Sequence, residues 1–166
     1  MIIRRTLPLL FAIAVTVMAH GARAQGMFDQ GRVRVGVMVG AVSSFNQTYF
    51  LLGASLGYFV LPGLEVGASF DTWLGNSPNV TRVAPELRYV LDIVDVVKPY
   101  LGGFYRRWIV GDGIRDLDSV GGRGGLIFVQ GQNAFIQAGA VYEHYVSSCD
   151  VDCSNWYPEI GIALVF

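Results

Sequence analysis

The sequence predicts an all-β fold, an eight-stranded antiparallel up-and-down transmembrane β-barrel. The chain is 52% hydrophobic and only 15% charged, yet no segment after Ala24 has the roughly 18 uninterrupted apolar residues that mark a membrane helix. Apolar residues instead alternate with polar ones or glycine in eight segments that are separated by turn residues. The charges inside these segments fall on the face opposite the apolar one. This pattern is typical of strands that cross a bilayer.

Residues 1–24 are predicted to form a secretory signal peptide. Arg4 and Arg5 supply a basic start, an apolar stretch covers 6–19, and a small-x-small site ends at Ala24. The apolar run is short and leads directly to the cleavage site, which favours a signal peptide over the alternative of an uncleaved anchor. Residues 25–166 are then expected to form one outer-membrane β-barrel domain.

The first half of this domain holds four alternating segments. In the third, the even positions from Leu64 to Phe70 are apolar, and the odd positions from Glu65 to Asp71 are polar or glycine. A side-chain period of two is that of a β-strand. The strands expected here cover about 32–42, 49–61, 64–73 and 81–91.

The second half holds four more segments, expected at about 98–110, 120–130 and 134–146, with a last strand that ends at Phe166. From Trp156 to Phe166 every second residue is apolar or proline. The connections after the second, fourth and sixth strands are short, and Pro62-Gly63 is the tightest of them. The other connections are more polar and mostly longer. With both ends in the periplasm, this asymmetry is that of outer-membrane barrels, and an even strand count leaves no exposed edge.

The charged face of the strands predicts which side chains fill the interior of the barrel. A soluble sandwich or lipocalin-like barrel is the alternative, and it would place charges outside and apolar residues within. The lumen of an eight-stranded barrel is just wide enough for side chains to fill it. We therefore expect a salt-bridge network that plugs the interior, in which loss of Arg88 or Glu86 destabilises more than loss of a loop charge. Its predicted members are Arg32, Arg34, Glu65, Asp71, Arg82, Glu86, Arg88, Arg106, Arg123, Glu143 and Glu159.

Two features qualify this prediction. Arg107 is the one charge inside a strand that falls on the apolar face, and it lies near the outer rim. A selective pore would more typically carry a ring of one charge sign, so a small-solute or ion channel is kept only as an alternative.

The sequence also lacks the basic patch that nucleic-acid binding needs.

The signal peptide, the eight segments, Pro99 to Gly103 at the start of the fifth strand and Phe166 together resemble the small outer-membrane β-barrel family, of the OmpA transmembrane-domain and OmpX type. The resemblance implies a porin-like monomer in the bacterial outer membrane, in contact with its lipids and lipopolysaccharide. It also implies that the barrel-assembly machinery reads Phe166 as an assembly signal. The expected role is structural, in envelope integrity or surface interaction, without catalysis or cofactor.

A lipid A-modifying acyl hydrolase is the second alternative. Some small barrels of this kind carry a His and a Ser that face the lipid at the outer rim. His144 occupies such a position, but residue 146 is Val, and Ser147 falls on the opposite face. A general base needs its partner within hydrogen-bond reach, so no enzyme is predicted.

The loops add two further expectations. Cys149 and Cys153 are expected to form a disulfide after export, whereas a metal site with Asp150 and Asp152 is the alternative. Three acids of the loop over 111–119 are interpreted as solvated charges, although oxygen ligands of this kind also suit a divalent cation; they are Asp112, Asp116 and Asp118. No metal site is predicted. The outward aromatics are expected to form interfacial girdles, and they are Phe50, Tyr58, Tyr89, Tyr105, Phe128, Tyr142 and Trp156.

Overall fold

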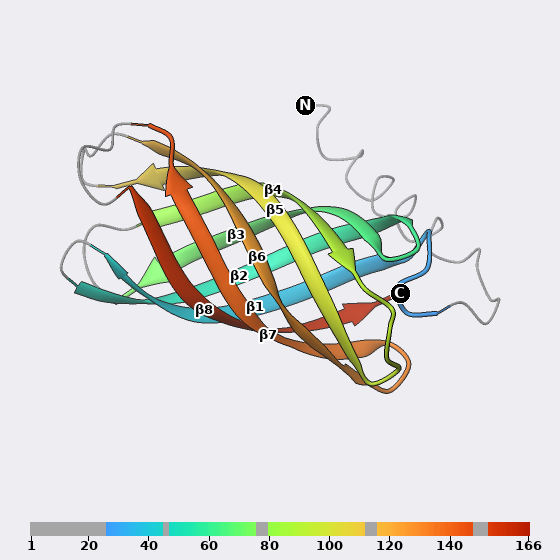
Figure 1. Ribbon diagram of the computed structural model, residues 1–166. Coiled ribbons are helices and arrows are strands. Elements are labelled where there is room, and N and C mark those ends of the chain that lie inside the picture. Colours follow the sequence, from blue (N-terminus) through green and yellow to red (C-terminus); the bar gives the residue numbers. More distant parts are fainter. Residues whose placement is uncertain (1–25, 45–46, 76–79, 112–115, 148–152) are drawn as a thin grey trace, which may run out of the picture.

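The computed structural model describes residues 26–44, 47–75, 80–111, 116–147 and 153–166. In this part of the chain, eight strands form one closed barrel in which each strand pairs antiparallel with its neighbours and β1 pairs with β8 (Figure 1). The predicted fold class is confirmed. The strands are β1 (Val33–Ser44), β2 (Gln47–Leu61), β3 (Leu64–Leu74), β4 (Val80–Val90), β5 (Val97–Val110), β6 (Leu117–Gln130), β7 (Ala134–Tyr145) and β8 (Ser154–Val165).

The strand bounds agree closely with the predicted ones, and the clearest difference is at the start of β6. This strand begins at Leu117, inside the segment that was expected to be an acidic loop. Trp108 pairs with Leu117 and Arg107 with Asp118 in the β5–β6 ladder. The exposed ion pair between Arg107 and Asp118, 2.9 Å from Nη1 to Oδ2, therefore lies within the hairpin and favours its extension.

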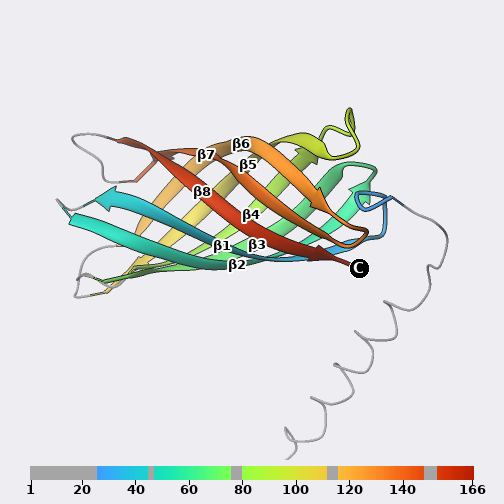
Figure 2. The ribbon, with the colours of Figure 1, turned by 90° about the horizontal axis from the view of Figure 1, so that it is seen from below.

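The two ends of the barrel differ. Gly26 and Phe166 lie at the same end as the three short connections after β2, β4 and β6, which we call the turn end (Figures 1 and 2). The opposite end, where β1 ends and β2 begins, is called the loop end. Gly63 makes the tightest turn, with a φ of 75°. A Cβ atom there would lie 2.5 Å from the carbonyl oxygen of Val90, so only glycine fits.

The barrel closes where β1 meets β8. The register of this pair runs from Arg34 opposite Val165 to Gly40 opposite Glu159. It stops immediately before Pro158, which has no N–H to donate to a ladder. The seam between the first and last strands is thus paired over the half of the barrel that is nearer to the turn end.

Burial alternates along the strands with the period of the sequence pattern. In β4 the even residues from Arg82 to Val90 are buried and the odd residues from Val83 to Tyr89 are exposed. Arg88 is 1% exposed, whereas its apolar neighbour Leu87 is 52% exposed. The polar face is inside and the apolar face outside, the reverse of a soluble β-protein. No helix in the described part of the chain is long and apolar enough to cross a membrane.

Candidate functional site: the filled interior of the barrel

The interior is arranged in layers along the barrel axis, and β4 shows their order. Two groups of buried apolar and aromatic residues occupy the two ends, and charged residues lie between them. From the loop end to the turn end, the inward residues of β4 are Val80, Arg82, Ala84, Glu86, Arg88 and Val90. One strand therefore runs through a loop-end layer, a charged middle and a turn-end layer.

The first charged cluster is built around Glu143, which is fully buried. Its Oε2 atom accepts hydrogen bonds from Arg106 Nη1 at 2.7 Å and from the Tyr157 hydroxyl at 3.0 Å. Its Oε1 atom accepts from Trp108 Nε1 at 3.0 Å and from the Ser119 hydroxyl. Both oxygens of this buried carboxylate are thus saturated, which is the condition for a tolerable buried charge.

Arg82 joins this cluster to the loop-end layer. Its Nε atom lies 2.5 Å from Asp71 Oδ1, and its Nη1 atom lies 3.5 Å from Glu143 Oε2. The guanidinium carbon lies 4.8 Å from the ring centroid of Trp108 and 5.2 Å from that of Trp73. Arginine over indole rings is a favourable cation–π arrangement, so the cation is held by carboxylates and by rings together.

The loop-end layer is a continuous set of rings. Trp73 packs against Tyr49 at 4.9 Å and against Trp108 at 5.0 Å between ring centroids. Trp108 in turn contacts Tyr145 at 5.1 Å. These side chains come from β2, β3, β5 and β7, so the rings reach across the lumen. They occupy the lumen on the side of the loop end.

The second charged cluster is built around Glu86. Its carboxylate lies 2.9 Å from Arg34 Nη2, 3.2 Å from Arg123 Nη1 and 3.6 Å from Arg88 Nη2. Arg34 also donates from Nε to Glu65 Oε1 at 2.7 Å. One carboxylate therefore faces three guanidinium groups from β1, β4 and β6.

Glu159 and Gln137 complete this cluster. Glu159 lies 3.7 Å from Arg123 and accepts a hydrogen bond from the Tyr100 hydroxyl at 3.1 Å. Gln137 accepts from Arg88 Nη1 at 2.9 Å. The Nη1 atom of Arg123 makes ion pairs with Glu86 and Glu159, but none of its three guanidinium nitrogens has a hydrogen bond of good geometry in the described part of the chain. This is the most loosely paired part of the interior.

Ten of the eleven predicted network residues lie in the interior and take part in these ion pairs. Five are arginines and five are carboxylates, so the charges balance. Arg32 differs from the expectation. It precedes β1, is partly exposed, and lines the mouth at the turn end, not the middle of the lumen. Lys98, which was not predicted to be inside, is buried and forms an ion pair with Asp92.

The turn-end layer is completed by a residue that precedes the barrel. Phe28 is 4% exposed and packs against Phe59 and Phe135, each at 5.7 Å between ring centroids. Its carbonyl oxygen accepts a hydrogen bond from Gly63 N at 2.8 Å. The segment before β1 therefore folds back under the barrel and closes its turn end. Sequence alternation could not reveal this, because Phe28 belongs to no strand.

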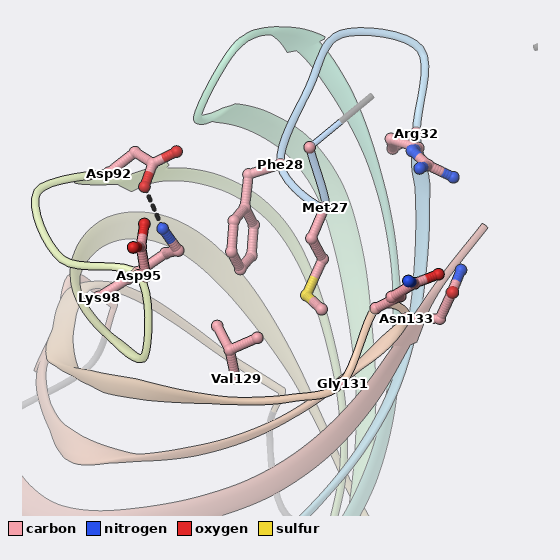
Figure 3. A pocket seen from close by; sticks show the side chains of 11 residues that line it. Met27, Phe28, Arg32, Asp92, Asp95, Lys98, Val129, Gly131 and Asn133 are labelled. Carbon is pink, nitrogen blue, oxygen red and sulfur yellow. Dashed lines mark hydrogen bonds and ion pairs between the residues drawn. The ribbon is translucent and has the colours of Figure 1, made fainter. Parts of the chain in front are cut away.

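A hollow of about 570 Å³ lies beside this segment and opens at the turn end (Figure 3). Phe28 and Val129 form part of its wall, and the ion pair of Lys98 with Asp92 lies at one side. Asp95 lies next to this pair and Arg32 lies across the hollow. Phe28 and Val129, which line the hollow, also belong to the turn-end layer.

Inward glycines make room for the large interior side chains. A Cβ atom on Gly121 would overlap the Phe104 ring, and one on Gly57 would overlap the carboxylate of Glu65. A Cβ atom on Gly139 would lie 2.6 Å from the Tyr100 hydroxyl. Aromatic and charged side chains that lie over glycines of nearby strands therefore fill the interior.

The outer face forms an apolar belt. Apolar side chains that are between one third and two thirds exposed cover every strand, for example Val37, Leu56, Leu87, Leu101 and Ile162. All seven predicted girdle aromatics are on this face, from Phe128 and Tyr142 at 37% exposed to Trp156 at 69%. Tyr142 and Trp156 stack as a pair at 4.9 Å.

The remaining predicted residues lie at the loop end. His144 is exposed, and the register places Ser154 directly opposite it on β8. The sequence alone does not indicate this serine, because its position opposite His144 depends on the register between β7 and β8. Among the described residues, no hydrogen bond joins these two side chains.

Arg107 is confirmed as the outward charge, and its partners are now identified. It pairs with Asp118 at 2.9 Å and with Asp116 at 3.2 Å. Asp112 and Cys149 lie outside the described residues, so the predicted disulfide with Cys153 stays a prediction. No group of three or more metal-binding side chains occurs within the described ranges.

A closed barrel with an apolar belt outside and paired ions inside defines a class of protein, the small transmembrane β-barrel. Solved structures share this architecture. The chain is similar to the N-terminal β-barrel domain of Pseudomonas aeruginosa OprF, with 17% identity, a TM-score of 0.68, and coverage of 82% of this chain and 98% of that one. It is similar to Neisserial surface protein A, with 19% identity, a TM-score of 0.62, and coverage of 81% and 96%.

A third similar structure is the outer membrane protein OprG from Pseudomonas aeruginosa, with 12% identity, a TM-score of 0.53, and coverage of 86% of this chain and 99% of that one. At these identities the likeness shows the fold. The chain thus has the fold of the small outer-membrane β-barrels, as the sequence resemblance implied. No protein-family model matches the chain, and neither does any curated protein.

Proposed function

We propose that this protein is an integral outer-membrane β-barrel with a closed interior, which acts in envelope integrity or surface interaction without catalysis. The observation that carries the proposal is the inverted distribution of side chains. Apolar residues such as Leu87 and Leu101 are 52% and 63% exposed, whereas Arg82 and Arg88 are 1% exposed. Water would disfavour such an exterior, and the hydrocarbon of a bilayer would favour it.

The closed interior argues against a pore. Rings around Trp73 and Trp108 fill the loop end, and Phe28, Phe59 and Phe135 fill the turn end. The ions between them are balanced in sign, and a filter that selects ions would carry a ring of one sign. A permanently open path for solutes is therefore not expected.

The exported location and the partners rest on the resemblance and on the fold. The predicted signal peptide would carry the chain out of the cytoplasm, and one of the similar solved structures is the outer membrane protein OprG. The apolar belt fits the lipids of that membrane, and the exposed Arg107 with its two acids would lie at the outer lipopolysaccharide interface. The barrel-assembly machinery would act on the strand that ends at Phe166. A monomer is sufficient, since the barrel closes on itself.

The test uses purified protein from outer-membrane fractions. Electrophoresis without boiling should give a compact band that shifts on heating, because a closed barrel resists detergent until it is unfolded. In planar bilayers the protein should show no large steady conductance. Solubility without detergent would contradict the membrane location, and a large steady conductance would contradict the closed interior.

A further inference from the structure

We propose that the connection between β4 and β5 is an interfacial membrane anchor, and that its partner is the lipid leaflet at the turn end. This inference rests on the proposed function, since it needs the barrel to span a membrane. The connection covers residues 91–96. It carries three exposed apolar side chains, Ile93 at 71%, Val94 at 54% and Val96 at 62%.

These exposures are unusual among the three connections at this end. The β2–β3 turn consists of Pro62 and Gly63, and the β6–β7 turn consists of Gly131, Gln132 and Asn133. A turn that faces only water has no reason to display three branched apolar residues, because their burial would be favourable by the hydrophobic effect. Contact with the apolar part of a lipid leaflet would explain why these side chains are exposed.

The connection separates its side chains by polarity. Asp92 and Asp95 line the hollow at the barrel mouth, and Asp92 pairs there with Lys98 (Figure 3). Ile93, Val94 and Val96 do not line the hollow. The connection thus has a polar side towards the mouth and an apolar side elsewhere, which is the division of an interfacial segment.

The apolar side is continuous with the lipid-facing belt. The carbonyl oxygen of Val96 accepts a hydrogen bond from Val129 N at 2.9 Å. Val129 directly follows Phe128, one of the outward girdle aromatics, and Phe128 pairs with Val97 in the ladder. The apolar residues of the connection are therefore held at the level where girdle residues meet the headgroups.

The consequence is an asymmetric belt. On the β4–β5 side the apolar surface extends past the strand ends, whereas it stops at the other two turns. When the apolar surface of a barrel is taller on one side, the protein tilts or the bilayer thickens locally. The connection would thus fix the orientation of the barrel relative to the membrane normal.

Spin labels at three positions test this proposal in the full barrel. Val94→Cys, Gln132→Cys and Leu87→Cys are each introduced into a Cys149→Ser/Cys153→Ser background and labelled. Each is then reconstituted in vesicles of phosphatidylethanolamine and phosphatidylglycerol. Collision of the label with oxygen reports lipid, and collision with a water-soluble nickel chelate reports water. Heat-modifiable mobility confirms that each variant is folded.

We expect the ratio of oxygen to nickel collisions at Val94 to be severalfold higher than at Gln132 and to approach that at Leu87. A Val94 label that is as accessible to nickel as the Gln132 label would overturn the anchor. Shielding from both reagents would also overturn it, since it would indicate a contact between protein copies. A Leu87 label that is accessible to nickel would instead contradict the membrane-spanning barrel itself.

Discussion

Val33 and Phe166 exchange two backbone hydrogen bonds, 3.0 Å from Val33 N to Phe166 O and 2.9 Å from Phe166 N to Val33 O. The first residue of β1 is thus bonded to the last residue of the sequence. The Phe166 side chain is 54% exposed on the outward face. It therefore lies on the outside of the seam between β1 and β8.

Deletion of Phe166 should reduce insertion while export continues. The deletion removes both seam hydrogen bonds and the aromatic side chain that the family resemblance identifies as an assembly signal. The amount of heat-modifiable barrel in outer-membrane fractions should fall, while processing of residues 1–24 is unchanged. Phe166→Tyr is the control, since it keeps the ring and the backbone. Normal outer-membrane levels of the deletion variant would refute an assembly role.

Glu86→Gln should destabilise the barrel strongly. The substitution keeps the volume but leaves Arg34, Arg88 and Arg123 around a neutral group. Removing one partner of a buried ion pair costs about 3–5 kcal/mol. The free energy of unfolding in urea, followed by tryptophan fluorescence in lipid vesicles, measures this cost.

Asp118→Asn is the matched control for Glu86→Gln. It also removes one carboxylate from an ion pair, but this pair with Arg107 is exposed to solvent. Its effect should be much smaller. Equal effects of the two variants would contradict the role of the interior network in stability.

Gly121→Ala and Gly122→Ala should differ sharply although the residues are adjacent. On Gly121 a methyl group would overlap the Phe104 ring and the carbonyl oxygen of Tyr142, whereas on Gly122 its nearest neighbour would be 3.6 Å away. Overpacking costs about 1–3 kcal/mol, and alanine on an open strand surface costs nothing comparable. The free energies of unfolding of both variants provide the measurement, and similar values would show that the interior can adapt.

Phe28→Ala should destabilise the barrel without opening it. The side chain loses its contacts with Phe59 and Phe135, and truncating a buried phenylalanine costs about 3 kcal/mol or more. The rings around Trp73 and Trp108 would still close the loop end. Urea unfolding should therefore shift, while planar-bilayer recordings remain without steady conductance. A large conductance in this variant would show that Phe28 alone closes the lumen.

The interior charges could be predicted because a strand has a side-chain period of two. Once Leu87 is assigned to the lipid face, Glu86 and Arg88 must face the lumen. The partners of each charge could not be predicted in this way, because they depend on the register between strands. The pair of Arg107 with Asp118, and Ser154 opposite His144, both arise from cross-strand register.

The two layers of aromatic rings differ in how far the sequence predicts them. Trp73 and Trp108 lie on the predicted lumen face and could have been found by extending the same alternation to aromatics. Phe28 lies before β1, where no alternation exists, and it is buried by contacts with Phe59 and Phe135, residues distant in the sequence. A chain segment that folds back onto a barrel has no local signature in the sequence.

The short register between β1 and β8 has a consequence for the mechanical behaviour of the barrel. A closed barrel has no strand edge, yet β1 continues beyond Gly40 to Ser44 and β8 begins at Ser154, before Pro158. Over these residues the two strands lie at the loop end without a described ladder between them. We expect β1 and β8 to separate first over this stretch. The hydrogen bonds between Val33 and Phe166 hold the opposite end of the same seam. Separation of β1 from β8 would therefore begin at the loop end and reach the turn end last.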